Sequence, residues 1–239
     1  MKNKKTLVII GHPDLEDSQS HQFLMQSGEA LSEIDYLDLN SVVDSNGNFD
    51  AFVEIKKLLA YDRIILQFQL YWYQAPMIFK QWFDQVFEYE MFHSELKRQF
   101  YQKELGIVVI AGAKESHYHR DGLYGVTMDD LLSPYIAFAK YMGMKQLPHF
   151  PVYQFQFYTE AQKFECILKY ICYLETGTVG SFGALQKVLL DKLDALTQQD
   201  LNFEETDWIV YENILTTFRQ QAEEITELYK LNQGDFYNE

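Results

Sequence analysis

The chain has 239 residues, which is enough for one large or two small domains. It carries 20 basic and 35 acidic side chains, and its formal charge is −15. Because nucleic acids and anionic membranes are bound through basic surfaces, this charge argues against either of them as the main partner.

An apolar run at residues 6–10 predicts a buried strand, and a polar loop follows it. A helix is predicted to begin near Ser20. Its free N–H groups and its dipole would point at the loop and could bind an anion. The loop lacks the glycine pattern of nucleotide-binding loops, so a phosphate there would need other donors. Those donors would be the hydroxyl of Ser18, the hydroxyl of Ser20 and the imidazoles of His12 and His21. The alternative is that Ser20 only caps the helix.

Residues 34–39 alternate between apolar and polar side chains and predict a second strand. A turn-rich loop at 40–48 leads to Asp50, which is predicted to cap a short helix. The apolar side chains of this helix fall on one face, and they are Phe52, Ile55, Leu58 and Leu59.

Residues 62–87 organise the rest of the chain. A short apolar run at 64–68, rich in β-branched residues, predicts a central parallel strand. An aromatic loop, Leu70-Tyr-Trp-Tyr73, follows it, and Pro76 then stands where the first turn of a helix tolerates proline. The helix through residue 87 has one wide apolar face. Since ligands of open α/β sheets lie beyond the carboxyl ends of the strands, the loop is suited to hold a planar ring. The alternative is an ordinary strand–helix unit with core aromatics.

A further buried strand is predicted at residues 106–112, and it leads into a second polar loop at 113–125. Thr127 then caps a predicted helix. Pro134 is expected to kink this helix or to shorten its first part. The last strand of the sheet is predicted at 150–154.

Strands alternate with helices through residue 155, which predicts an α/β fold with a doubly wound, five-stranded parallel sheet and helices on both faces. The remaining chain is predicted to form three helices, at 159–174, 182–196 and 202–230. The predicted division is therefore a domain at 1–157 and a C-terminal helical extension at 158–239, packed on the same domain.

The two cysteines indicate a reducing compartment. Cys166 and Cys172 lie six positions apart in an apolar helical pattern, and they have neither a disulfide framework nor metal-ligand spacing. They are expected to be buried free thiols. No signal-peptide pattern and no uncharged span of 18 residues is found, so the protein is expected to be cytoplasmic and not embedded in a membrane.

The segment Leu70-Tyr-Trp-Tyr-x-x-Pro76, followed by Lys80-x-Trp-Phe-Asp-x-Val-Phe87, closely resembles the NAD(P)H dehydrogenase (quinone) family of flavodoxin-like flavoproteins. The early loop, with His12-Pro13 and Ser18-Gln-Ser-His21, is similar to the corresponding loop of that family. The second loop is also similar, in Ala111-Gly-Ala113, Ser116, Tyr118 and Gly122. The resemblance covers roughly residues 5–155. It implies a flavodoxin-like fold, with extra C-terminal helices in this chain.

The resemblance also implies an activity. Members of the family bind FMN or FAD non-covalently, take hydride from NAD(P)H and pass two electrons to a quinone-like acceptor. The implied cofactor-binding residues are His12, Ser18, Ser20 and His21 around the phosphates, Leu70, Tyr71, Trp72 and Tyr73 along the ring, and Gly112, Ala113 and Lys114 at its pyrimidine end. The implied catalytic residues are Tyr118, which matches the active-site tyrosine of the family, and Tyr124, where some members carry a catalytic histidine.

The sequence departs from the family pattern at several of these positions. Gln69 replaces a proline and His21 replaces an asparagine, while Ala111, Ala113 and Lys114 replace a threonine and two small residues. His117 and His119 flank Tyr118 and could suggest a metal, but no third ligand has matching spacing, and a solvated loop is the favoured interpretation. No metal is therefore expected.

Other functions remain open at this point. An azo- or nitroreductase and a flavoprotein partner that regulates a transport system belong to the same class of flavoproteins. A non-catalytic flavodoxin-like module, which would use the C-terminal helices for interaction, belongs to a different class.

A homodimer is expected from the apolar surface. The face of 75–87 and the aromatic residues between Tyr89 and Phe100 exceed what one face of a sheet covers, and large exposed apolar patches usually mark interfaces. Members of the resembled family also pair so that the partner chain closes the flavin pocket. Residues 88–102 favour no helix or strand.

Overall fold

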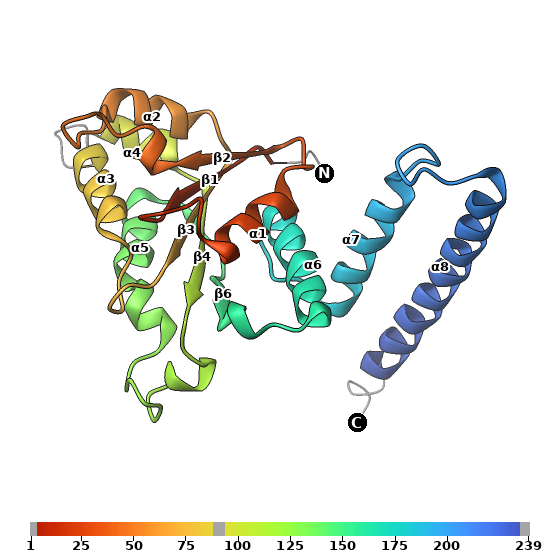
Figure 1. Cartoon of the computed structure of the whole chain (residues 1–239). Coiled ribbons are helices and arrows are strands. Elements are labelled where there is room, and N and C mark those ends of the chain that lie inside the picture. The colour runs from red at the N-terminus through yellow and green to blue at the C-terminus, as the bar shows by residue number, and fades with distance from the viewer. Residues whose placement is uncertain (1–3, 88–93, 235–239) are drawn as a thin grey trace. The chain divides into compact units, whose positions relative to one another are not determined.

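The computed structural model describes residues 4–87 and 94–234. All of its described strands belong to one parallel sheet, which lies in the left half of Figure 1. In spatial order they are β2 (Ile34–Asp38), β1 (Thr6–Gly11), β3 (Arg63–Gln69) and β4 (Glu104–Ala111), with β5 (Lys145–Gln146) and β6 (Phe150–Tyr153) both beside β4. The predicted α/β fold class is confirmed.

The fifth position of the sheet is shared by two short strands. β5 pairs with the first residues of β4 and β6 with the last ones, so that the two strands continue one line. Pro148 lies between them, and proline has no N–H to continue the ladder of hydrogen bonds. The predicted five-stranded sheet is therefore present, with its outer strand interrupted.

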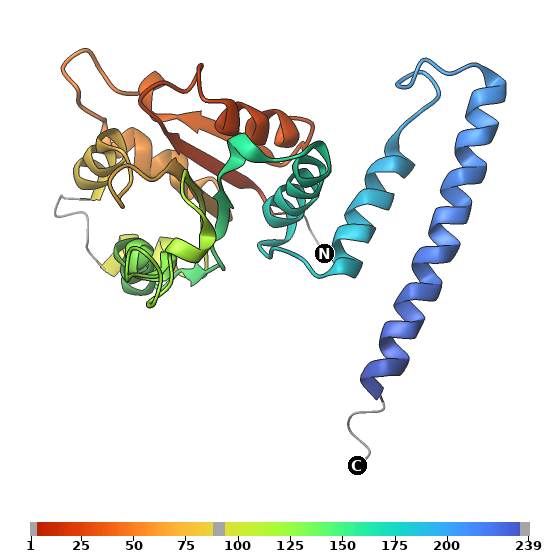
Figure 2. The ribbon, with the colours of Figure 1, turned by 60° about the horizontal axis from the view of Figure 1, so that its bottom comes forward.

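Helices cover both faces of this sheet, as Figures 1 and 2 show. α1 and α6 lie on one face, and α2 to α5 lie on the other. Their bounds are α1 (Gln19–Gly28), α2 (Ala51–Leu59), α3 (Met77–Phe87), α4 (Ser94–Phe100), α5 (Met128–Met142) and α6 (Glu160–Thr176). Short 3₁₀ turns stand at η1 (Leu39–Ser41), η2 (Glu115–His117) and η3 (Phe155–Phe157). The central strands are buried on both sides, as their continuous apolar runs predict.

Helix α6 belongs to the core of the first compact unit, which runs to Val179 instead of ending at residue 157. The sequence pattern assigned this helix to the C-terminal extension, but Tyr170 and Tyr173 are fully buried between it and the sheet. Gly106 permits the close approach, because a Cβ at that position would lie 2.5 Å from the hydroxyl of Tyr173. Cys166 and Cys172 of α6 are buried free thiols, as predicted.

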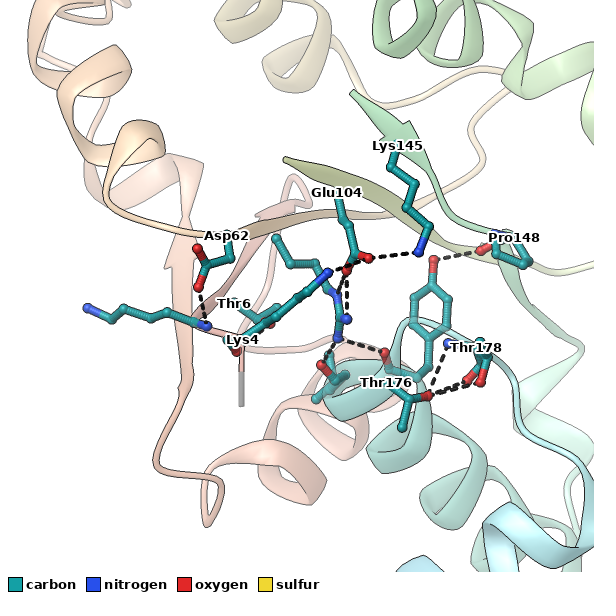
Figure 3. A network of polar contacts seen from close by, with 12 residues as sticks. Lys4, Thr6, Asp62, Glu104, Lys145, Pro148, Thr176 and Thr178 are labelled. Carbon is teal, nitrogen blue, oxygen red and sulfur yellow. Dashed lines mark hydrogen bonds and ion pairs between the residues drawn. The ribbon is translucent and has the colours of Figure 1, made fainter. Parts of the chain in front are cut away.

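A buried ionic network ties α6 to the amino-terminal ends of the central strands (Figure 3). Arg63 at the start of β3 forms a pair of 2.7 Å with Glu104 at the start of β4, and both side chains are 2% exposed. Arg63 also donates to the backbone carbonyl of Leu174 near the end of α6. Lys4 and Lys145 bind the other oxygen of Glu104 at 2.6 Å and 3.1 Å. The network lies at the opposite edge of the sheet from the loops described below, so it serves stability.

Two local predictions are corrected by the structure. α5 is neither interrupted nor shortened at Pro134, and Thr127 caps it as predicted. The hydroxyl of Ser133 donates to the carbonyl oxygen of Asp130, which a residue with an N–H at position 134 would otherwise bind. Within residues 88–102, for which no element was predicted, α4 begins at Ser94. Tyr89 and Phe92 lie outside the described residues.

Residues 180–239 form the second compact unit. Its described elements are α7 (Phe182–Ala195) and α8 (Glu205–Gly234), which confirm the last two predicted helices. The hydroxyl of Tyr211 donates to the carbonyl of Leu193 at 2.8 Å, and Arg219 pairs with Asp194. Packing of this unit on the first stays a prediction. In the described ranges, no helix combines the length and apolar character needed to cross a membrane.

Candidate cofactor site

The carboxyl ends of β1, β3 and β4 lie side by side at one edge of the sheet. In the register of the parallel pairs, Gly11 stands opposite Phe68, and Gln69 stands opposite Ile110. Each strand is followed by one of the three loops that the sequence singled out. Ligands of open α/β sheets bind beyond this edge, so the topology brings the predicted site residues to the expected place.

The four candidate phosphate-binding residues of the first loop and the start of α1 are buried, although other side chains of this loop are exposed. His12, Ser18, Ser20 and His21 are all 9% exposed or less. Ser18, and not Ser20, occupies the N-cap position of α1, and its side chain makes no capping hydrogen bond. The first N–H groups of a helix have no partner within the helix, so the start of α1 retains donors for an external acceptor.

His12 joins the first loop to the second. Its Nδ1 accepts from the backbone N–H of Asp14 at 3.1 Å, and its Nε2 lies 3.2 Å from the hydroxyl of Tyr71. Since Nδ1 is an acceptor, a neutral His12 carries its proton on Nε2 and donates to Tyr71. The phenol proton of Tyr71 is then available to another acceptor. Asn40 holds the loop from the other side by donating to the carbonyl of His12 at 2.7 Å.

His21 lies in the first turn of α1 and is fully buried. Its Nδ1 lies 3.1 Å from the amide nitrogen of Gln67, and its ring centroid is 5.0 Å from that of His12. Burial first, and the neighbouring imidazole of His12 second, lower the pKa of His21 to about 3, so the ring of His21 is neutral at physiological pH. Among residues 4–87 and 94–234, the Nε2 atom of His21 has no hydrogen-bond partner.

The second loop is a tight turn with an unusual backbone. Tyr71 and Gln74 exchange backbone hydrogen bonds of 2.8 Å and 3.1 Å. Trp72 and Tyr73 between them both have positive φ, at 48° and 67°, which is the pattern of a type I′ turn. Glycine and asparagine favour this conformation, whereas aromatic side chains are strained in it. Strained residues of this kind gather at functional sites, and the indole of Trp72 is 90% exposed here.

The third loop folds into a cluster of tyrosines. The ring of Tyr118 is 7% exposed and lies 5.1 Å from Tyr124 and 5.6 Å from Tyr153, measured between centroids. Tyr124 in turn lies 5.0 Å from Tyr73, which connects this loop to the second. Burial, with the nearby Tyr124 and Tyr73, raises the pKa of Tyr118, so its phenol keeps its proton at neutral pH.

The two glycines of the third loop differ in the space beside their backbone. A Cβ on Gly122 would lie 2.4 Å from the carbonyl oxygen of Ser116, so the loop closes only with glycine there. Gly112 instead faces open space, because a Cβ at that position would have no described atom of another segment within 4 Å. Ala113 is half-buried beside it, and Lys114 is exposed. Open space next to the backbone suits the approach of a ligand ring.

Several residues of the site were not singled out by the sequence. Gln67, Asn40 and Tyr153 all contact predicted site residues, but they lie in a strand interior, a turn and a strand end without any motif. His117 is half-buried against Tyr124 and is not fully solvated, whereas His119 is exposed. Within the described parts of the chain, no cluster of three or more His, Cys, Asp or Glu side chains is arranged to hold a metal ion.

An open groove adjoins the second loop. One cavity of about 590 Å³ is lined by residues that include Trp72, Tyr73 and Tyr135. A second, of about 760 Å³, lies between α3 and α5. The two share Phe83, Asp84 and Pro134, so the groove continues from the aromatic turn along both helices.

The sheet order, the start of α1 and the three joined loops define an open α/β protein with a candidate site for an anionic, planar ligand. The family model of the flavodoxin-like fold matches residues 4–171. The chain belongs to this family, as its resemblance predicted.

Many known proteins are similar to this chain, and three of them are described here. An uncharacterised NAD(P)H oxidoreductase of Bacillus subtilis is 36% identical over 149 residues, which are 62% of this chain and 85% of that protein. The crystal structure of an NADPH-quinone reductase from P. pentosaceus superposes with a TM-score of 0.66 at 33% identity, over 72% of this chain and 98% of that one. The general stress protein 14 of Treponema denticola, solved in complex with FMN, has a TM-score of 0.63 at 27% identity, over 71% of this chain and 97% of that one.

Proposed function

We propose that the protein is a flavin-dependent NAD(P)H oxidoreductase that passes two electrons, as hydride, to a quinone or a related acceptor. The observation that carries this proposal is the start of α1, where an N-cap serine makes no capping bond and a buried histidine nitrogen has no partner among the described residues. The NADPH-quinone reductase and the NAD(P)H oxidoreductase among the similar proteins support the reaction class. The complex of a similar protein with FMN supports FMN over FAD.

The residues present fit such a cofactor. Ser18, Ser20, His12 and His21 would surround the phosphate, because the first loop offers hydroxyl, imidazole and backbone donors and places no acidic side chain in a buried position among the described residues. The turn after β3 would border the ring system through the backbone of Leu70, Tyr71, Trp72 and Tyr73. Gly112, Ala113 and Lys114 would lie at its pyrimidine end.

When bound, a flavin supplies the hydride and electron transfer itself. The chain contributes fixed donors and keeps them in place. Tyr118 is protonated at neutral pH and is held between Tyr124 and Tyr153, so its hydroxyl can only donate or accept a hydrogen bond and does not act as a base. Preorganised donors of this kind stabilise negative charge that develops on a reduced ring or an acceptor.

The first test is direct. The purified protein is expected to carry a flavin, to oxidise NADH or NADPH, and to reduce members of a quinone panel. Mass spectrometry of the released cofactor identifies FMN or FAD. A protein that binds no flavin would favour the non-catalytic interaction module. Faster turnover of azo or nitro compounds than of quinones would favour an azo- or nitroreductase. The similar proteins give only weak support to the other open alternative, a flavoprotein partner that regulates a transport system.

Replacing Tyr118 by Phe keeps the ring in its cluster and removes only the hydroxyl. Loss of one preorganised donor typically costs about 2.7–4 kcal/mol in the transition state. Because Tyr124 lies close enough to substitute, we expect the lower end of that range or less. Stopped-flow measurement of flavin reduction and of reoxidation by quinone checks this. Tyr61→Phe is the matched control, since it removes a phenol hydroxyl that binds Asp35 at the opposite edge of the sheet. Unchanged rates in Tyr118→Phe would leave that residue only a wall of the site.

We also propose that the protein is cytoplasmic and acts as a homodimer. Much of the apolar face of α3 packs into the core, since Phe79, Trp82 and Phe87 are buried. Less apolar surface is therefore left for an interface than the sequence suggested. Met77 at the start of α3 and Trp72 on the preceding turn stay exposed, at 83% and 90%, and Trp72 lines the cavity that continues into the groove between α3 and α5. A partner that covers this groove would also cover the aromatic turn of the site.

The dimer is tested by Met77→Glu. Sedimentation velocity at micromolar concentration is expected to show a dimer for the original protein and a shift toward monomer for the variant, because a carboxylate would be buried unpaired at the interface. Phe52→Glu is the matched control, since Phe52 is 71% exposed on α2, away from the groove. A monomer in the unmodified protein would overturn the proposal.

A further inference from the structure

A buried chain of hydrogen bonds leads from helix α6 to the candidate phosphate site. The hydroxyl of Tyr170 donates to the amide oxygen of Gln67 at 2.8 Å, and the amide nitrogen of Gln67 lies 3.1 Å from Nδ1 of His21. Tyr36 stands at the far end, with its hydroxyl 3.4 Å from that of Tyr170. Gln67, Tyr170 and His21 are each 0% exposed, so water does not replace any of these partners.

The order of donors along this chain determines the tautomer of His21. Since the amide oxygen of Gln67 accepts from Tyr170, its NH₂ group is the part that faces His21. An NH₂ group only donates, so Nδ1 of His21 must be the acceptor. A neutral imidazole has a single N–H, which therefore lies on Nε2, the atom that has no partner in the described part of the chain.

We propose that Gln67 is a positioning residue for the cofactor phosphate, because it fixes the proton of His21 on Nε2, where it serves as a donor to a phosphate monoester. This inference rests on the proposed flavin site. The role of Gln67 goes through His21, and Gln67 itself does not touch the phosphate.

The surroundings of His21 support a neutral donor. Its pKa is lowered to about 3 by burial and by His12, so the ring does not contribute a positive charge to the site. An unfixed neutral imidazole can offer either a donor or a lone pair at Nε2, and a lone pair would repel a phosphate oxygen. A buried polar group left without a partner is costly, which makes an external acceptor for Nε2–H the simplest account of its position.

The test compares FMN with riboflavin, which differ only in the phosphate. The variant is Gln67→Leu, which has similar volume and no amide. We expect the preference of the protein for FMN over riboflavin to fall about 10-fold or more, as expected for a hydrogen bond to a charged group, while riboflavin affinity is unchanged. Tyr36→Phe is the matched control, since it alters the far end of the chain and leaves the contacts of Gln67 in place.

The second readout needs no flavin. Long-range ¹H–¹⁵N spectra of the ring of His21 in the free protein are expected to show the proton on Nε2, and to show a mixture of tautomers in Gln67→Leu. If that variant does not fold, Tyr170→Phe, which removes the donor that orients the amide, is expected to give the same mixture.

The outcomes separate this inference from the proposed function. A proton on Nδ1 of His21 in the unmodified protein, or an FMN preference that survives Gln67→Leu, overturns the inference while the flavin site stands. A protein that shows the expected tautomer but binds neither FMN nor riboflavin overturns the proposed function and the phosphate role together.

Discussion

Replacement of Glu104 by Gln is expected to lower the free energy of unfolding of the first unit by about 3–5 kcal/mol at neutral pH, the range found when one partner of a buried ion pair is removed. Glu104 is 1% exposed, and its carboxylate forms ion pairs with Arg63, Lys4 and Lys145. Without its charge, the guanidinium of Arg63 stays buried and uncompensated. Urea unfolding followed by near-ultraviolet circular dichroism measures the change.

The same carboxylate predicts a pH dependence. Burial alone would raise its pKa, but the hydrogen bonds from Lys4 and Arg63, the charge of Arg63 and the hydrogen bond from Lys145 outweigh burial and lower the pKa of Glu104 to about 2. A carboxylate whose pKa is depressed on folding contributes stability above its unfolded value, 4.5, and that stability is lost as the pH falls toward 2. The lost stability is on the order of 3 kcal/mol.

The control for this prediction is Glu165→Gln on α6. Glu165 pairs with Lys169 at the surface, where its side chain is 59% exposed, so the change is expected to cost less than about 1 kcal/mol. Glu104→Gln should also flatten the acid limb of the stability curve, because the titrating group is gone. Equal stability of the two variants, or an unchanged acid limb in Glu104→Gln, would contradict the assignment of the network to stability.

The double variant Ser18→Ala with His12→Ala is expected to weaken flavin binding about 100-fold while the fold is retained. Each hydrogen bond to a charged group contributes about 1.5–3 kcal/mol, and a loss of about 2.7 kcal/mol corresponds to that factor. Ser18 loses an unused donor at the start of α1, and loss of His12 also releases Tyr71. Flavin fluorescence on dilution gives the affinity.

Burial of the loop makes controls necessary for this variant. His12 and Ser18 are 7% and 8% exposed, so a loss of packing has to be separated from a loss of phosphate contacts. Ser27→Ala removes a hydroxyl from the same helix, where it bonds the carbonyl of Phe23 away from the site. Circular dichroism should match across the proteins. An undiminished flavin occupancy in the double variant would remove Ser18 and His12 from the binding site.

Much of the fold could be predicted from local patterns. Continuous apolar runs identified β1, β3 and β4, because a strand buried on both faces has no polar side to alternate with. Capping residues placed the starts of helices α2 and α5 at Asp50 and Thr127. Alternation of strands and helices then determined that three loops meet at one edge of the sheet.

The interactions within that edge were decided only by the tertiary structure. Gln67 contacts His21 and Tyr170, which are 46 and 103 positions away in the chain. A contact between residues so far apart in sequence cannot be predicted from a local pattern. Trp72 and Tyr73 adopt a backbone that their own propensities oppose, because the contacts of Tyr71 and Tyr73 with neighbouring loops hold the turn.

Burial at the other edge of the sheet was likewise invisible in the sequence. In the sequence, Arg63 and Glu104 are charged residues at the starts of strands, where side chains are often exposed. In the structure both are buried, and Arg63 binds a backbone carbonyl of α6. Local patterns of apolar and capping residues therefore specify the strands and helices, and the alternation of these elements specifies the edge at which a ligand would bind. The packing of distant segments decided the burial, protonation and partners of the side chains, because those depend on groups that meet only after the chain has folded.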